Sequence, residues 1–141
     1  MRYDMDIDIK ALVFGAAIAA AFIIFGWQFK NEWLYPFSAI GLLYIGYGQN
    51  SIKKGAILGA LGATPIVVLT LQGYMGTASG FFVTENGILA VTAIILLVGA
   101  LVGLVGAWAK RDRMKAMAEY EKQQKIGKNK NKNKNKNKKN K

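Results

Sequence analysis

Apolar residues gather into four long blocks, and charged residues fall only between and outside these blocks. The blocks cover residues 11–29, 33–52, 55–72 and 88–109 and contain no Asp, Glu, Lys or Arg. A surface helix of a soluble protein needs a polar face, and none of the blocks has one. Each block is close to the length of a helix that crosses a bilayer. The pattern therefore predicts an all-α integral membrane protein with four transmembrane helices.

The second and third blocks carry irregular features. The strictly apolar part of the second block, residues 33–48, would extend about 24 Å as an α-helix, less than the hydrocarbon core of about 30 Å. We expect this helix to continue through Gln49 to Ile52, which brings it to length. Pro36 falls in the first turn, where its missing N–H costs little. Pro65 lies inside the third block and predicts a kink.

The basic residues orient the predicted spans. Of the 19 Lys and Arg residues, all except Lys30 fall on one side of the four spans. Cytoplasmic segments of membrane proteins carry this excess of Lys and Arg. The residues that set the orientation are Lys53, Lys54, Lys110, Arg111 and Arg113. We therefore expect a multi-pass protein of the cell membrane, with the N-terminal segment 1–10 and the C terminus both in the cytoplasm.

The chain after the fourth block changes in character twice. Residues 110–126 are mostly good helix formers and predict a cytoplasmic helical extension. Residues 127–141 alternate Lys with Asn, bury nothing and predict a disordered basic tail. Three interpretations of the tail stay open: contact with anionic lipid, phosphate contacts to RNA without sequence specificity, and a dispensable solubilising repeat.

Glycine is the best-patterned residue inside the predicted membrane domain, residues 11–109. Small residues spaced four apart let helices approach closely in a bilayer. The predicted helix-packing residues are Gly55, Gly59 and Gly62 on the third span, and Gly99, Gly103 and Gly106 on the fourth. All lie mainly in the expected cytoplasmic half, which predicts a bundle that is tight on that side and splayed on the other. The glycine faces either pack the bundle itself or mediate self-association.

Residues for catalysis are scarce. The chain has no Cys and no His, and no ionisable side chain falls inside a predicted span. An ionisable residue at membrane depth is the usual marker of a transport or proton-relay site. We therefore expect no enzymatic activity, no cofactor, no metal site and no proton-coupled transport.

The segment between the third and fourth blocks is unusual for an exposed loop. Residues 73–83 are apolar and rich in glycine. They predict either a re-entrant loop or an interfacial loop anchored by Tyr74, Phe81 and Phe82. Asn86 is the expected N-cap of the fourth helix.

Two stretches of sequence resemble a known family. Residues 44–49 read Tyr-Ile-Gly-Tyr-Gly-Gln, and residues 53–62 read Lys-Lys-Gly-Ala-Ile-Leu-Gly-Ala-Leu-Gly. Together with the glycine placement over residues 11–108, they resemble small four-helix membrane proteins of archaea that form a domain of unknown function. The resemblance implies an uncharacterised membrane protein and no particular functional residue. Small multidrug exporters also have four spans, but they use a carboxylate in the first helix, and residues 11–29 contain none.

These features favour a structural or interaction role. We expect a small membrane protein that packs with itself or with a larger membrane partner through its glycine faces. The alternatives are a passive channel or carrier for uncharged solutes, with a glycine-lined path, and a pore former of the holin kind. No sequence-specific contact with nucleic acid is expected.

Overall fold

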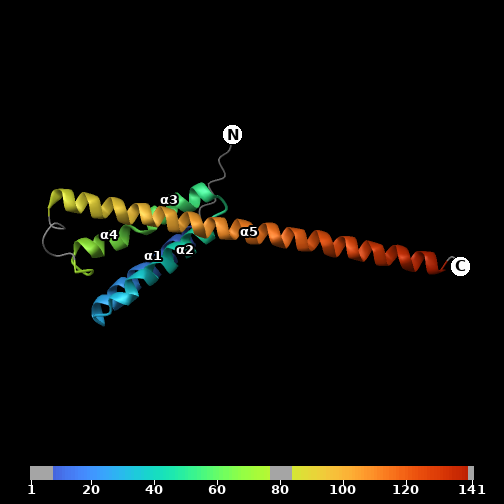
Figure 1. The fold of residues 1–141 in the computed structure, drawn as a ribbon, viewed down its shortest axis with the longest axis horizontal. Helices are drawn as coiled ribbons and strands as arrows, with labels where there is room; N and C mark the ends of the chain where they lie inside the picture. The colour runs from blue at the N-terminus through green and yellow to red at the C-terminus, as the bar shows by residue number, and fades with distance from the viewer. Residues whose placement is uncertain (1–7, 77–83, 140–141) are drawn as a thin grey trace. The chain divides into compact units, whose positions relative to one another are not determined.

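The computed structural model describes residues 8–76 and 84–139, with side chains through Lys125, and the described chain is helical apart from turns. It divides into two compact units, residues 1–110 and residues 111–141. The elements are α1 (Ile9–Gln28), the 3₁₀ helix η1 (Glu32–Phe37), α2 (Ser38–Gly48), α3 (Ile52–Gly62), α4 (Thr64–Leu71) and α5 (Glu85–Lys139) (Figure 1).

Three helical stretches in the described residues are long and apolar enough to cross a membrane. They are Ile9–Gln28, Ile52–Leu71 and Glu85–Lys125. The expected all-α class and the apolar, membrane-compatible helices are therefore confirmed.

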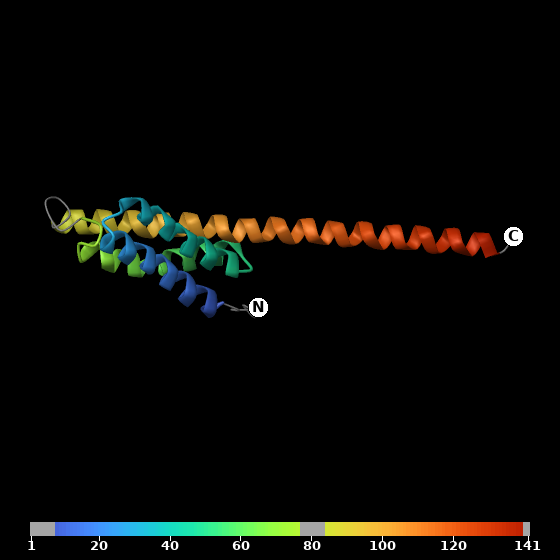
Figure 2. The same ribbon diagram turned by 90° about the horizontal axis from the view of Figure 1, so that it is seen from below.

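The first helix and the segment that follows it form an antiparallel hairpin. Asp8 caps α1, since its carboxylate oxygen accepts a hydrogen bond from the Ala11 N–H at 3.0 Å. The two helical arms of the hairpin are in contact along their length. Ala11 lies against Gly48, Gly15 against Gly41, Phe22 against Phe37 and Gly26 against Tyr35. Figure 2 shows α1 running beside α2.

The second predicted span differs from the structure. Residues 33–52 were expected to form one helix, but they form η1 and α2, and α2 ends at Gly48. The backbone of Gln49 is extended, and its side-chain Nε2 donates to the Ile45 carbonyl at 3.3 Å. The side-chain amide thus bonds to the Ile45 carbonyl, which the Gln49 backbone N–H would use if the helix continued. Gly48 is also a poor helix former. The predicted continuation to Ile52 was therefore wrong.

The third predicted span is interrupted near its proline. Ala63 separates α3 from α4, and Pro65 lies in the first turn of α4, where no N–H is required of it. The interruption expected at Pro65 is confirmed. The helix begins at Ile52, three residues before the predicted 55–72 block, so Lys53 and Lys54 lie in its first turn. Of the expected loop anchors, Tyr74 is described, whereas Phe81 and Phe82 lie outside the described residues.

The last helix begins earlier and ends later than expected. The Thr84 hydroxyl oxygen accepts from the Gly87 N–H at 3.1 Å, so Thr84 is the N-cap and the assignment of Asn86 was wrong. The span at 88–109 and the extension at 110–126 form one continuous helix, which runs through Lys139. Disorder was expected from Gly127, whereas the structure is helical there through Lys139. Lysine is a good helix former, and an existing helix gains one hydrogen bond for each residue it adds.

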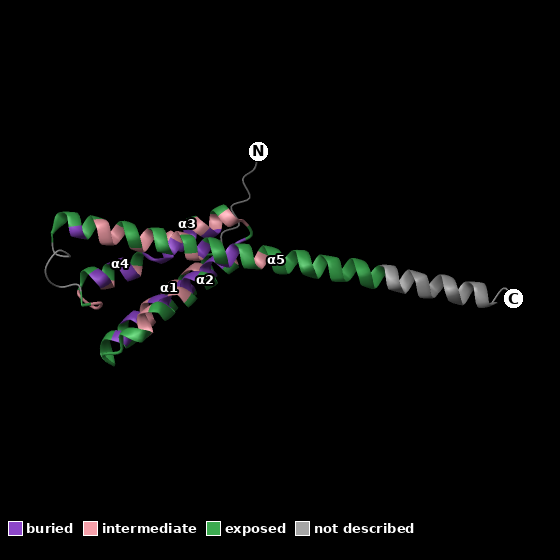
Figure 3. Cartoon of the chain, viewed as in Figure 1, coloured by how far each residue is buried: buried purple, intermediate pink, exposed green. Residues whose placement is uncertain are grey.

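The core of the first unit lies where these helices meet (Figure 3). It consists of Ala19, Ile23, Leu42, Ile45, Leu58, Ala63 and Ile66. Many large apolar side chains are exposed on the outer faces of the same helices, including Phe14, Phe25, Ile57 and Leu101. Such a distribution is unfavourable in water and suits helices whose outer faces contact lipid.

Candidate functional site

Gly103 lies at the closest approach of three helices. A Cβ built on Gly103 would overlap the Gly55 carbonyl oxygen of α3, and a Cβ built on Gly46 of α2 would overlap the Gly103 carbonyl oxygen. One helical turn away, a Cβ on Gly59 would overlap the Gly99 carbonyl oxygen. The backbones of α2, α3 and α5 are therefore in direct contact, which only glycine permits. We call Gly46, Gly55, Gly59, Gly99 and Gly103 the glycine junction.

The six predicted packing glycines lie at two kinds of contact, that of α3 with α5 and those of α3 and α5 with α2. Gly55 and Gly59 face Gly99 and Gly103 across the contact of α3 with α5. Gly62 instead faces the Ile45 side chain of α2. Gly106 faces the Leu43 carbonyl and the Tyr47 N–H, also on α2. The structure thus brings all six predicted glycines into contacts between helices of the first unit.

A second close approach joins α1 to α2, through glycines that are not among the six predicted packing residues. Cβ atoms on Gly15 and Gly41 would each meet the other helix's backbone, so α1 and α2 also touch. The signal for this contact is the run of Ala11, Gly15 and Ala19, three buried small residues spaced four apart.

Polar contacts gather at the end of the first unit where α1 begins and α2 ends, which we call the Lys110 end. Gln49 is 1% exposed, and its Oε1 accepts from the Asp8 N–H at 3.4 Å. The Lys110 ammonium donates to the Gly48 carbonyl at 3.1 Å and to the Asn50 side-chain oxygen at 2.9 Å. Lys110 therefore ties α5 to the turn between α2 and α3.

The other residues predicted to set the topology lie in α3 and α5. Lys53 is exposed in the first turn of α3, and the adjacent Lys54 is half-buried. Arg111 and Arg113 are exposed in the second unit.

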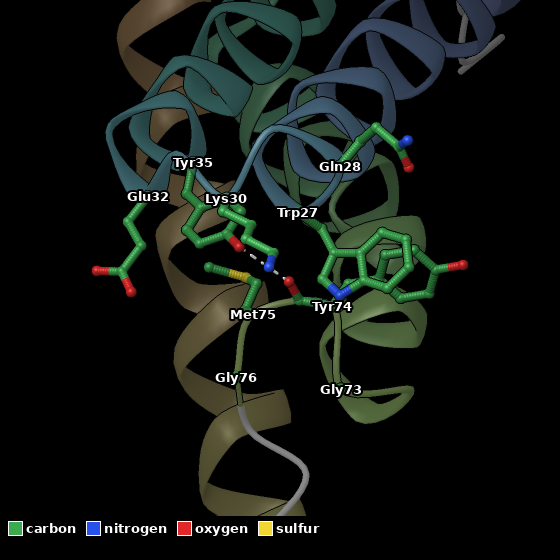
Figure 4. Close-up of a pocket in the computed structure, with 9 residues that line it drawn as sticks. All are labelled: Trp27, Gln28, Lys30, Glu32, Tyr35, Gly73, Tyr74, Met75 and Gly76. Atoms are coloured by element: carbon green, nitrogen blue, oxygen red, sulfur yellow. Dashed lines mark hydrogen bonds between the residues drawn. The ribbon is translucent and has the colours of Figure 1, made fainter.

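A pocket of about 390 Å³ opens at the opposite end of the first unit, the Lys30 end (Figure 4). Nine residues line it: Trp27, Gln28, Lys30, Glu32, Tyr35, Gly73, Tyr74, Met75 and Gly76. The Tyr35 hydroxyl donates to the Tyr74 carbonyl at 3.0 Å, and the rings of Trp27 and Tyr74 lie 5.0 Å apart. These contacts join the turn after α1 to the turn after α4.

The lining combines one cation, one carboxylate and three aromatic rings. Such a set can bind a small polar group that is attached to an apolar one. In the part of the chain that the structure describes, no group of three or more Asp and Glu side chains could hold a metal ion. The sequence does not reveal this pocket because its two halves lie far apart in the chain, with Tyr35 and Tyr74 separated by 39 positions. Lys30, the one cation on its side of the predicted spans, was the available signal.

No family model, no curated protein and no solved structure matches this chain.

Proposed function

We propose that the chain is a four-span membrane protein with both termini in the cytoplasm. The second span would be η1 and α2, which contain 6 and 11 residues. Because a 3₁₀ helix rises about 2.0 Å for each residue, the two together extend about 28 Å, close to the hydrocarbon thickness of about 30 Å. The positions of Lys53, Lys54 and Lys110 at one end, and of Lys30 at the other, support the orientation.

Within this topology, the proposed role is structural or interactive: a small membrane subunit that packs with itself or with a larger membrane partner. The observation that carries this proposal is the slight burial of α5. In an apolar 18-residue stretch of α5, 11% is buried inside the structure, against 44% in the corresponding stretch of Ile52–Leu71. Within the first unit, the narrow face of α5 that carries Gly99, Gly103 and Gly106 contacts α2 and α3.

The opposite face of α5 is a stripe of bulky apolar side chains. Its members are Ile94, Leu97, Leu101, Val105 and Trp108, which are between 48% and 62% exposed. They recur every three or four residues and so share one side of the helix. Because the glycine junction is used inside the first unit, we propose that this stripe, rather than the glycines, contacts the partner.

The channel alternative is less well supported by the packing. It requires a glycine-lined path, yet the glycine junction brings backbone onto backbone with no space for a Cβ atom. A solute or a lytic pore would need a path between copies of the chain, so these functions also depend on assembly.

The test is the native mass of the tagged protein, extracted gently from host membranes. Leu97→Ala combined with Leu101→Ala shortens the stripe, and Val13→Ala combined with Ile18→Ala makes a change of nearly the same size at two exposed positions of α1. We expect an assembly larger than the 15.4 kDa chain for the unchanged protein and for the α1 variant, and a smaller one for the α5 variant. A monomer for the unchanged protein, or equal losses in both variants, would contradict the proposal.

A further inference from the structure

Lys30 occupies a backbone conformation that lysine rarely adopts. Its φ is 51°, in the left-handed region, and it is the only described non-glycine residue with a positive φ. Glycine or asparagine would adopt this conformation at lower cost. Residues held in such conformations cluster at functional sites. Here Lys30 ends α1, since the Asn31 N–H donates to the Gly26 carbonyl and the Lys30 N–H to the Trp27 carbonyl. The sequence thus places an ammonium at the edge of the pocket, at a position where glycine is the usual residue.

The pocket walls are fixed from two directions. Tyr35 from η1 bonds to the backbone of Tyr74, and Trp27 from α1 packs against the Tyr74 ring. Figure 4 shows the Lys30 side chain on the same side as the Tyr35 hydroxyl, while Glu32 is directed away from both. The site therefore has a formed aromatic wall, a cation beside it and a carboxylate at its rim.

We propose that this pocket binds the phosphodiester headgroup of a membrane lipid. The Lys30 ammonium lines the pocket and is suited to a phosphate oxygen. Trp27, Tyr35 and Tyr74 are the residue types that lie at the level of lipid headgroups, with apolar rings toward the acyl chains.

The Glu32 carboxylate limits which lipid headgroups fit the pocket. One Lys and one Glu leave the lining with no net charge, so a phosphomonoester dianion is disfavoured. A phosphodiester carries a single negative charge, and a headgroup with hydroxyl or ammonium donors can also bond to Glu32. The pocket thus fits a phosphodiester that carries such donors, as in phosphoglycerol or phosphoethanolamine headgroups.

This inference rests on the membrane placement proposed above, but not on the oligomeric role. The test uses the full chain in detergent, with Trp33→Phe and Trp108→Phe so that Trp27 is the only tryptophan. Short-chain phosphatidylglycerol is titrated while Trp27 fluorescence is recorded, and soluble glycerophosphoglycerol is titrated in parallel. We expect saturable binding of the lipid, and binding of the soluble headgroup that is weaker by tenfold or more because it lacks acyl chains.

Two substitutions at Lys30 separate binding from folding. Lys30→Gln should weaken lipid binding about tenfold, the loss expected for one charge-assisted hydrogen bond. Lys30→Gly should weaken binding equally yet raise the thermal unfolding midpoint, because glycine relieves the strained φ. Lys53→Gln, which removes an exposed cation at the other end, should change the affinity less than twofold.

Equal losses of lipid affinity in Lys30→Gln and Lys53→Gln would overturn the pocket as the binding site, because general attraction between the basic chain and the lipid would then explain the binding. Equal affinity for glycerophosphoglycerol and the lipid would overturn the lipid assignment. Extraction of the membranes with alkaline carbonate reports the membrane placement independently. A protein that resists extraction but shows no lipid binding at Lys30 would contradict this inference alone.

Discussion

Gly103 shows how much of this structure depends on the absence of a single methyl group. Gly103→Ala would place a Cβ against the Gly55 carbonyl, so α3 and α5 would have to separate. We expect a loss of about 1–3 kcal/mol in the free energy of unfolding, the usual cost of overpacking. Ala93→Leu adds more volume at an exposed position of the same helix and should change the stability by less than about 0.5 kcal/mol. Thermal unfolding in detergent measures both, and equal shifts would show that the junction does not hold the helices.

Lys110 and Arg111 are neighbours of equal charge with different contacts. Lys110 donates to Gly48 and Asn50, whereas Arg111 is exposed in the second unit. Lys110→Met keeps the apolar stem and removes both hydrogen bonds, so we expect it to cost about 1 kcal/mol. Arg111→Met should cost less than half as much. Urea unfolding of the two variants compares these values, and matching midpoints would contradict a locking role for Lys110.

At the scale of elements, the sequence predicts the long helices well and the short ones poorly. Uninterrupted apolar runs are enough to predict α1, the Ile52–Leu71 stretch and the membrane part of α5. The end of α2 could not be predicted, because it depends on the Gln49 side chain turning back to Ile45. The pocket could not be predicted either, because the contact between Tyr35 and Tyr74 exists only after the two hairpin turns come together.

The end of α5 is the clearest disagreement between pattern and structure. Composition predicts disorder from Gly127, whereas the structure continues the helix to Lys139. Because residues 127–139 are helical, a protein lacking residues 127–141 should lose helical signal equal to about three and a half turns. Circular dichroism at 222 nm, expressed per mole of protein, measures this loss. An unchanged molar signal would mean that the segment contributes no helix.

For the whole molecule, the account depends on which end of the first unit faces which side of the membrane. The Lys110 end carries Asp8, Gln49, Asn50 and the turn into α3, and the Lys30 end carries the pocket. The glycine junction is nearer the Lys110 end, in keeping with a bundle that is tightest on the proposed cytoplasmic side. If the orientation is reversed, the pocket faces the cytoplasm and its proposed lipid belongs to the inner leaflet.

The most direct test of the account is single-cysteine labelling in intact cells. The chain has no native cysteine, so Glu32→Cys, Ser51→Cys and Lys122→Cys each introduce one reactive site. We expect a membrane-impermeant maleimide to label Glu32→Cys in intact cells and to label the other two only after permeabilisation. Labelling of Ser51→Cys from outside, or of Glu32→Cys and Lys122→Cys from the same side, would contradict the four-span topology.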